Sequence, residues 1–348
     1  MNFVVIGGAG FVGSVITSEL VESNNSVLVF DDLSTGHIKD VHPGAFLTVG
    51  TLLDATQINS VLNGADVVIH CGFKTSVEQA NNSQELVWHN NYIGTTNLIN
   101  AMILNNVKKL VVSSTCEVYE NTNTKDLLEN DPTNPLTVYG VTMKSVEEMF
   151  DHVTKTRGIN TTILRYFNVS GAYKSEILGW IYDRNKYSKD IILKIIKNIK
   201  KNKLGLEVIT GFKKTKDKTQ IVDFLHVNDI AKAHILAALQ PQENPLEIIN
   251  LGNNEKNTIL ELINKIEKEC GVELQKTFKK QKQIESSFLI SSNEKAFKLL
   301  NWKPEKNITD IIQSLIICLS IKVKKKKTTN KKPKWFEFKK IPELIRGK

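Results

Sequence analysis

The stretch that decides the fold is Gly7-Gly8-Ala9-Gly10-Phe11-Val12-Gly13, which lies between an apolar run, Phe3–Ile6, and a segment of helical period, Gly13–Ser23. Its glycines permit a tight turn, let the backbone approach a pyrophosphate closely and let the helix pack against the strand. The N-terminus of the helix offers N–H groups to an anion. The order strand, glycine turn, helix therefore predicts a dinucleotide site made by Gly7, Gly10, Phe11, Val12 and Gly13. An ordinary glycine turn is the alternative.

Asp31 follows the next apolar run, Val27–Phe30, and lies 18 residues after Gly13. A carboxylate at this place can accept hydrogen bonds from both ribose hydroxyls and repels a 2′-phosphate. The position therefore favours NAD over NADP as the cofactor. A second interpretation is that Asp31 or Asp32 caps the loop that follows.

Short apolar runs alternate with helical stretches through the first half of the chain, which predicts an α/β fold with a doubly wound parallel sheet. Asp54 is expected to cap the second helix. The predicted strands are Phe3–Ile6, Val27–Phe30, Ala45–Val49, Val67–His70, Leu110–Ser113 and Thr161–Arg165. The predicted crossover helices are Gly13–Ser23, Ala55–Leu62, Trp88–Asn105 and Val138–Thr156.

The second half of the chain predicts a smaller, interleaved C-terminal substrate domain. An insertion at about Gly171–Thr219 contains a basic helix, Asp190–Asn202, and later come strands at Gln220–His226 and Glu247–Leu251 and a helix at Thr258–Cys270. We expect residues 1–172 to form the NAD-binding domain, with 220–252 returning to it. Residues 173–219 and 253–321 would form the substrate-binding domain, leaving a cleft at the carboxyl edge of the sheet.

Positive charge is concentrated at the C-terminus. The net charge is +9, but residues 322–348 hold 12 of the 46 basic and only 2 of the 37 acidic residues, so the other residues are close to neutral. This distribution argues against a nucleic-acid-binding body and makes 322–348 a basic tail. The lysines of the tail, together with Trp335–Phe338, suit an anionic partner; the alternative is a solvated charge run.

The four cysteines are far apart in the sequence and have no metal-ligand spacing, which predicts reduced thiols, a cytoplasmic location and no metal site. The chain runs from Met1 directly into the first apolar strand, so we expect no secretory signal. The longest apolar run, Ile311–Val323, is about 13 residues, too short to cross a bilayer. It predicts a final amphipathic helix in a soluble protein.

Several further motifs carry a family resemblance. They are Val-Ile-His (68–70), Asn-Asn-Tyr-Ile-Gly-Thr (90–95), Ser-Ser-Thr-Cys-Glu-Val-Tyr (113–119), Tyr-Gly (139–140), Leu-Arg-Tyr-Phe-Asn (164–168), Asp-Phe-Leu-His-Val-Asn-Asp (223–229) and Ile-Asn-Leu-Gly (249–252). In order and spacing, residues 1–320 resemble the extended short-chain dehydrogenase/reductase (NAD-dependent epimerase/dehydratase) family. Within it they are most similar to the nucleotide-sugar 4-epimerases of the UDP-glucose/UDP-galactose type, which have a Rossmann-type fold.

The resemblance implies roles for particular residues. Thr115 and Tyr139 would be catalytic, with Tyr139 also at the cofactor beside Lys74, Asn91 and Phe167. The nucleotide-sugar would contact Thr115, Asn168 and Lys282. The implied reaction uses NAD to oxidise a sugar hydroxyl transiently to a 4-keto sugar. The resemblance also implies a homodimer paired through Trp88–Asn105 and Val138–Thr156. The alternative is that the apolar faces of these helices belong to a monomer core.

The sequence departs from the family pattern at the residue four positions after Tyr139. The family places a lysine there, one helical turn from the tyrosine, and this chain has Met143. Lys144 is about 140° from Tyr139 around a regular helix and is expected to point elsewhere. Thr51 and Val222 likewise stand where the family has residues that contact the adenine and the diphosphate. Lys282 and Glu285 match the later arginine-containing motif only loosely.

These departures leave two other functions open. One is a binding protein that keeps the NAD fold without turnover, since a fold does not guarantee chemistry. The other is a nucleotide-sugar dehydratase or decarboxylase, because Glu117 matches an acidic residue of those relatives. Cys116 argues against the dehydratase, which has an aspartate there, and a structural role for Glu117 is the alternative.

Overall fold

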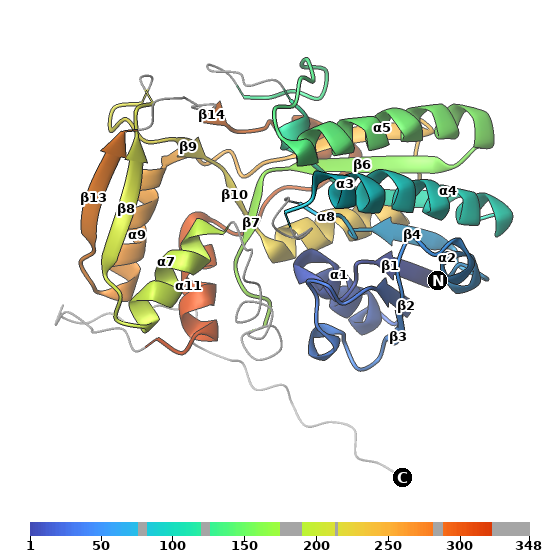
Figure 1. The fold of residues 1–348 in the computed structure, drawn as a ribbon, viewed down its shortest axis with the longest axis horizontal. Helices are drawn as coiled ribbons and strands as arrows, with labels where there is room; N and C mark the ends of the chain where they lie inside the picture. The colour runs from blue at the N-terminus through green and yellow to red at the C-terminus, as the bar shows by residue number, and fades with distance from the viewer. Residues whose placement is uncertain (76–81, 120–125, 175–189, 213–214, 281–287, 322–348) are drawn as a thin grey trace, which may run out of the picture.

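A computed structural model describes residues 1–75, 82–119, 126–174, 190–212, 215–280 and 288–321 (Figure 1). The central element is a seven-stranded parallel sheet with the order β11-β6-β5-β4-β1-β2-β3. The order reverses beside β1, where a doubly wound sheet opens a crevice for a ligand. The predicted doubly wound α/β fold is thus confirmed. Its strands are β1 (Asn2–Ile6), β2 (Ser26–Asp31), β3 (Phe46–Val49), β4 (Val67–His70), β5 (Lys109–Thr115), β6 (Asn160–Tyr166) and β11 (Leu246–Leu251).

Helices cover both faces of the sheet because each buried strand places alternate side chains on opposite faces. In β1, Phe3 and Val5 join one apolar cluster, and Val4 and Ile6 join another. Figure 1 shows α5 with α3 and α4 on one side of the sheet and α1 on the other. The sheet-flanking helices are α1 (Phe11–Glu22), α2 (Ala55–Val61), α3 (Gln84–Trp88), α4 (Gly94–Leu104), α5 (Val138–Arg157), α8 (Val227–Leu239) and α10 (Glu294–Leu300).

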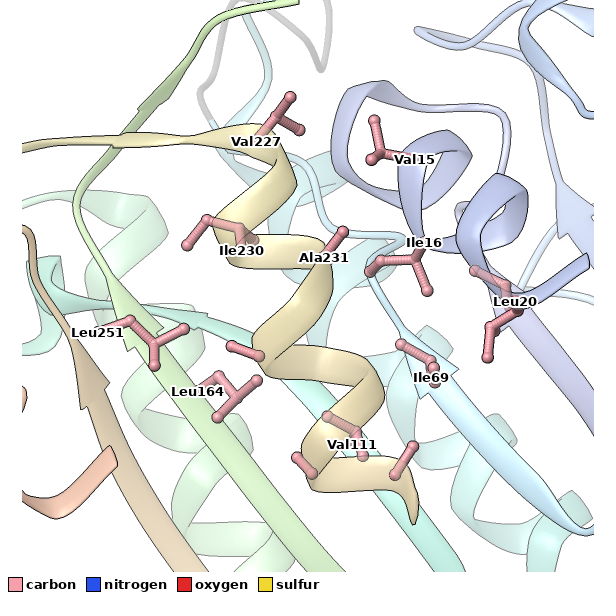
Figure 2. Close-up of a cluster of buried hydrophobic side chains, with 14 of the residues drawn as sticks. Val15, Ile16, Leu20, Ile69, Val111, Leu164, Val227, Ile230, Ala231 and Leu251 are labelled. Carbon is pink, nitrogen blue, oxygen red and sulfur yellow. The ribbon is translucent and has the colours of Figure 1, made fainter. Parts of the chain in front are cut away.

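Figure 2 shows how α8 fills the layer beside α1. Val227 and Ala231 of α8 lie on the side of the helix that faces Val15 and Ile16 of α1, Ile230 points to the other side, and strand residues lie beneath them. The sequence analysis did not identify α8, which follows β10 (Phe224–His226) without a loop. Its N-cap is His226, whose ring Nδ1 accepts a hydrogen bond from the backbone N of Asn228, a cap that the usual Ser, Thr, Asp and Asn signals miss.

Two predicted elements differ from the structure. The helix expected at Trp88–Asn105 begins at Gln84, capped by Ser83, and is interrupted by a π-helical turn, η3 (His89–Ile93), before α4. The strand expected at Gln220–His226 divides into β9 (Ile221–Val222) and β10, which pair with different strands. Asp223 separates them because its buried carboxylate accepts hydrogen bonds from the backbone N of Asn253. A polar anchor of this kind leaves no trace in the apolar pattern.

Part of the remaining chain forms a second apolar core beside the carboxyl edge of the sheet. The amphipathic helix α7 (Ile191–Lys200) buries its isoleucines there and exposes lysines, as its basic period predicts. The predicted final helix is observed as α11 (Ile308–Cys318), and the part of that prediction beyond Ile321 lies outside the described residues. The other elements are α9 (Ile259–Cys270), β7 (Asn168–Ser170), β8 (Gly205–Thr210), β12 (Asn257–Thr258), β13 (Gln275–Lys280), β14 (Phe288–Leu289) and the 3₁₀ turns η1 (Ile38–Asp40) and η4 (Cys116–Val118).

Candidate active site

The glycine turn between β1 and α1 leaves no space for side chains. Gly7 has a φ of +76°, and a Cβ there would lie 2.6 Å from the backbone of Gly72. A Cβ on Gly13 would lie 2.2 Å from the carbonyl oxygen of Gly7. Gly10 is the N-cap of α1, no side chain caps this helix, and its first turn contains no acidic residue. The N-terminus of α1, which includes Phe11 and Val12, is therefore suited to an anion.

Asp31 lies at the carboxyl end of β2, next to this turn. Its Oδ2 accepts a hydrogen bond from the backbone N of Ala9 at 2.9 Å, and its Oδ1 accepts one from the backbone N of Leu33 at 2.8 Å. Burial raises the pKa of Asp31, and the bonds from Leu33 and Ala9 oppose that shift. The carboxylate thus fixes the loop after β2 against the glycine turn, and each oxygen keeps a lone pair for a ribose hydroxyl.

Lys74 reaches across this region from the loop after β4. Its Nζ forms an ion pair with Asp32 at 3.3 Å and also donates to Ser34 Oγ. The backbone of Lys74 is held by Asn91, whose Oδ1 accepts from its N at 2.8 Å and whose Nδ2 donates to its O at 3.0 Å. Asn91 Nδ2 also lies 3.2 Å from Thr142 Oγ1 on α5. Asn91 therefore orders the loop beside the pocket, and Lys74 closes one side of it.

A pocket lies at the carboxyl edge of the sheet, where these elements meet. Gly7, Gly10, Asp31 and Lys74, four of the predicted cofactor residues, line it. Other lining residues come from the ends of β1, β2 and β4 and from the loop after β3, among them Ile6, Phe30, Gly50, Leu52, Cys71 and Gly72. The bare backbone at the glycines, the uncapped helix and the acceptor at Asp31 fit the pyrophosphate and ribose of a dinucleotide.

Thr115 and Tyr139 come from different elements that meet beyond the sheet edge. Thr115 ends β5, is 5% exposed, and its Oγ1 accepts a hydrogen bond from the backbone N of Glu117 at 3.0 Å. Tyr139 is in the first turn of α5. The next residue, Gly140, packs so closely on the turn after β5 that a Cβ there would lie 2.5 Å from the carbonyl oxygen of Glu117. The first turn of α5, which carries Tyr139, therefore packs against the turn that follows Thr115.

Thr137 adds a second link between these elements, which the sequence analysis missed. Its Oγ1 accepts from the backbone N of Gly140 as the N-cap of α5 and donates to Glu117 Oε2 at 2.7 Å. A threonine directly before the predicted helix start at Val138 is an N-cap signal that could have identified it. Glu117 therefore contacts the N-terminus of the helix that carries Tyr139.

The surroundings of Tyr139 disfavour its anion. Burial raises the pKa of Tyr139 well above 10, and the negative charge of the nearby Glu117 raises it further. Met143, one turn along α5, is fully buried and packs in an apolar cluster with Tyr139 and Phe167 at its edge. Lys144 points away, since its Nζ donates to the carbonyl oxygen of Thr133 at 3.0 Å. The ammonium of Lys74 is likewise committed elsewhere, since it pairs with Asp32.

Asn168 lies on the side of the site that faces the second core. It begins β7, which pairs with β10, and its Nδ2 donates to the backbone O of Asp223 at 3.2 Å. Asn168 and the 223–229 segment are therefore neighbours. Burial raises the pKa of Asp223 to about 7. Lys282 and Glu285 lie outside the described residues.

Three further properties of the described residues bear on function. No group of three or more His, Cys, Asp and Glu side chains among them could hold a metal ion. None of the helices in the described ranges is long and apolar enough to cross a membrane. None of the four cysteines forms a disulfide.

Comparisons with known proteins identify relatives over nearly the whole chain. The sequence profile of the NAD dependent epimerase/dehydratase family matches residues 3–252. A protein of Lactobacillus helveticus named UDP-glucose 4-epimerase is 32% identical over 316 residues, which are 90% of this chain and 95% of that relative. One of the same name from Lacticaseibacillus casei is 32% identical over 314 residues, 89% of this chain and 93% of the relative. A UDP-glucose 4-epimerase from Brucella ovis, solved in complex with NAD, superposes with a TM-score of 0.84 at 26% identity and covers 93% of this chain and 99% of its own.

Proposed function

Because the chain belongs to the NAD-dependent epimerase/dehydratase family, we propose that it is a nucleotide-sugar 4-epimerase that interconverts UDP-glucose and UDP-galactose. The observations that support this proposal are the pocket lined by the glycine turn and Asp31, and the contact of the first turn of α5, which carries Tyr139, with the turn that follows Thr115. The relatives named UDP-glucose 4-epimerase align with this chain over 88–90% of its length. The substrate class follows from them.

In the proposed reaction, each side chain handles a proton or a hydrogen bond. Tyr139, as phenolate, takes the proton of the sugar 4-hydroxyl, and Thr115 donates a hydrogen bond to the reacting oxygen. NAD, when bound, supplies reversible hydride exchange with the sugar carbon. The glycine turn and Asp31 hold the dinucleotide, with Lys74, Asn91 and Phe167 beside it. The keto sugar rotates in the cleft so that its opposite face is presented. Tyr139 then returns the proton to the oxygen of the opposite epimer.

Met143 limits this chemistry. A phenol with an ordinary pKa near 10 is a weak base at neutral pH, so a neighbouring cation is needed to favour the anion. Met143 supplies no charge, and Lys144 is committed to Thr133. The expected consequence is slow turnover that rises steeply with pH.

A second candidate is a binding protein that holds NAD and a nucleotide-sugar without turning them over. Two observations favour it, the raised pKa of Tyr139 and the buried, uncharged Met143. A dehydratase or decarboxylase has less support. Glu117 contacts the N-terminal turn of α5 through Thr137, which gives it a structural role.

Turnover and cofactor content distinguish these candidates. The purified protein is incubated with UDP-galactose and NAD, and UDP-glucose is measured by a coupled dehydrogenase. Bound NAD is measured in parallel after denaturation. Epimerisation supports the enzyme. Bound NAD with no conversion of either UDP-sugar supports the binding protein, and release of water or carbon dioxide from a nucleotide-sugar supports the third function.

We also propose that the protein is a cytoplasmic homodimer. Apolar side chains remain exposed on the helices that cover one face of the sheet, with Leu86 42% exposed on α3, Leu104 75% on α4 and Val141 38% on α5. Burial of these residues against a second copy would remove them from water. Sedimentation equilibrium tests this, with a dimer mass expected and a monomer mass contradicting it.

We further propose that the basic tail, 322–348, binds an anionic partner. Salt-dependent retention of the tail on an anionic matrix tests this proposal.

A further inference from the structure

Two serines immediately before Thr115 bind to opposite helix layers. Ser113 Oγ lies 2.7 Å from Nε2 of His234 on α8. Ser114 Oγ donates to Oε1 of Glu147 on α5. All four side chains are at most 6% exposed. The end of β5 is therefore anchored from both faces of the sheet, one and two residues before the threonine.

The direction of the hydrogen bond between Ser113 and His234 follows from a third group. His234 Nδ1 lies 2.8 Å from the carbonyl oxygen of Ile230, one turn earlier on α8. A carbonyl oxygen only accepts, so Nδ1 carries the hydrogen, and in a neutral ring Nε2 must then be the acceptor. Burial lowers the pKa of His234 to about 4, which keeps the ring neutral at physiological pH. The hydroxyl of Ser113 therefore donates to His234, and Cys71 Sγ, 3.1 Å from the same oxygen, is left to donate to it.

On the other face, Glu147 is held by an ion pair. Arg165 on β6 donates through Nε to both carboxylate oxygens, at 3.1 and 3.2 Å, and through Nη2. Arg165 is also the direct neighbour of Ser114 across the β5–β6 pair. Glu147 therefore joins both strands to α5, the helix whose first turn contains Tyr139. This buried charge pair has geometry that specifies one arrangement of helix and sheet.

We propose that His234 and Glu147 are positioning residues for the epimerase reaction, acting through Ser113 and Ser114 to hold Thr115 in register with Tyr139. The inference rests on the proposed function and adds two residues that touch neither cofactor nor sugar. The physical reason is that misplacement of a reacting group by about 1 Å can cost roughly a hundredfold in rate. Thr115 comes from a strand and Tyr139 from a helix, so their separation depends on how these elements are joined.

The test removes each serine hydroxyl and compares the result with a matched control. Ser113→Ala and Ser114→Ala each remove one anchor and leave the Glu147–Arg165 pair in place. The control is Thr154→Val, because Thr154 Oγ1 lies 3.2 Å from Thr161 Oγ1 and also joins α5 to β6, but at the end far from Tyr139. All three variants lose one buried hydroxyl. The readouts are kcat, KM, the Kd for NAD and the melting temperature.

We expect each serine variant to lose about 10–100-fold in kcat, with KM and the Kd for NAD within about twofold of the parent. Thr154→Val should keep its kcat within about twofold while its melting temperature falls as much as in the serine variants. His234→Gln, whose amide oxygen can still accept from Ser113, should retain more kcat than His234→Leu. Serine variants with the parent's kcat, or a Thr154→Val variant equally impaired, would overturn the proposal.

A second readout does not depend on turnover. Amide hydrogen exchange of residues 115–119 in the NAD-loaded protein should be about tenfold faster in Ser113→Ala and Ser114→Ala and unchanged in Thr154→Val. Equal exchange in all variants overturns the anchoring claim even if the parent is active. If the parent converts neither UDP-sugar, the proposed function fails, and the exchange result alone decides whether the anchors exist.

Discussion

Replacing Met143 by lysine would restore a cation one helical turn from Tyr139. An ordinary phenol is about 0.1% ionised at pH 7, and burial makes Tyr139 less ionised still. An opposite charge within about 4–6 Å lowers a pKa by roughly 1–3 units, so the phenolate population at neutral pH rises about 10–1000-fold, equivalent to about 1.4–4 kcal/mol. Met143 is fully buried, which lowers the pKa of a lysine placed there and reduces the gain. We therefore expect kcat at pH 7 to rise about 10–30-fold, the lower part of that range.

The assay measures ionisation and rate on the same proteins. Phenolate absorbance of the NAD-loaded protein is titrated with pH, with Tyr139→Phe subtracted to isolate one tyrosine, and kcat for UDP-galactose is measured from pH 6 to 9. Met143→Leu is the neutral control of similar volume. Lys144→Ala should change neither readout, because its ammonium binds the carbonyl oxygen of Thr133. If Met143→Lys and Met143→Leu ionise Tyr139 at the same pH and have equal kcat, the reasoning about the missing cation is wrong.

Three further predictions concern the turn and two buried ionisable groups. Gly13→Ala should abolish measurable NAD binding, because its Cβ would lie 2.2 Å from the Gly7 carbonyl, while Gly205→Ala, with nothing within 4 Å, should bind NAD like the parent in calorimetry. The pKa of His226 is lowered to about 4 by burial, so its contribution to stability is complete above pH 6.5 and is lost as pH falls towards 4. The free energy of unfolding, measured with urea, should fall by about 3 kcal/mol over that range, and by less in His226→Asn. Burial raises the pKa of Asp223 to about 7, so its protonated form contributes stability below pH 4 that is lost as pH rises through 7. Between those limits the free energy of unfolding of Asp223→Asn should rise by up to about 4 kcal/mol relative to the parent. A pH-independent difference between the two proteins would contradict the assignment.

The sheet could be predicted from the sequence because its strands are buried on both faces and therefore form nearly continuous apolar runs. β1 and β4 show this, since each contains four consecutive buried residues. The glycine turn could be predicted because its shape excludes side chains, which restricts the residue type directly. Asp54 as the cap of α2 could be predicted for the same kind of local reason, and the structure confirms it.

Contacts that depend on tertiary packing could not be predicted in this way. His234 has the spacing of an ordinary buried residue on α8, and only the approach of β5 gives its ring a partner in Ser113. Glu147 reads as one charge among several on α5 until Arg165 is placed opposite it. The sequence offered one signal for the Glu147–Arg165 pair, which is an acidic residue on an otherwise apolar face of the helix. An acid on such a face is seldom fully buried unless it is paired with a cation. The split of β9 from β10 likewise depends on Asp223 and a loop thirty residues away.

Turnover of the unmodified protein decides whether this chain acts as a nucleotide-sugar 4-epimerase. Purified full-length chain with NAD is incubated with UDP-galactose at pH 8.5, where a weak tyrosine base is most ionised within a range that proteins tolerate, and UDP-glucose is quantified over time. We expect conversion that approaches the same mixture from either sugar, is slow at pH 7 and faster at pH 8.5, and is absent in Tyr139→Phe. NAD-loaded, folded protein that converts neither UDP-sugar at either pH would contradict it.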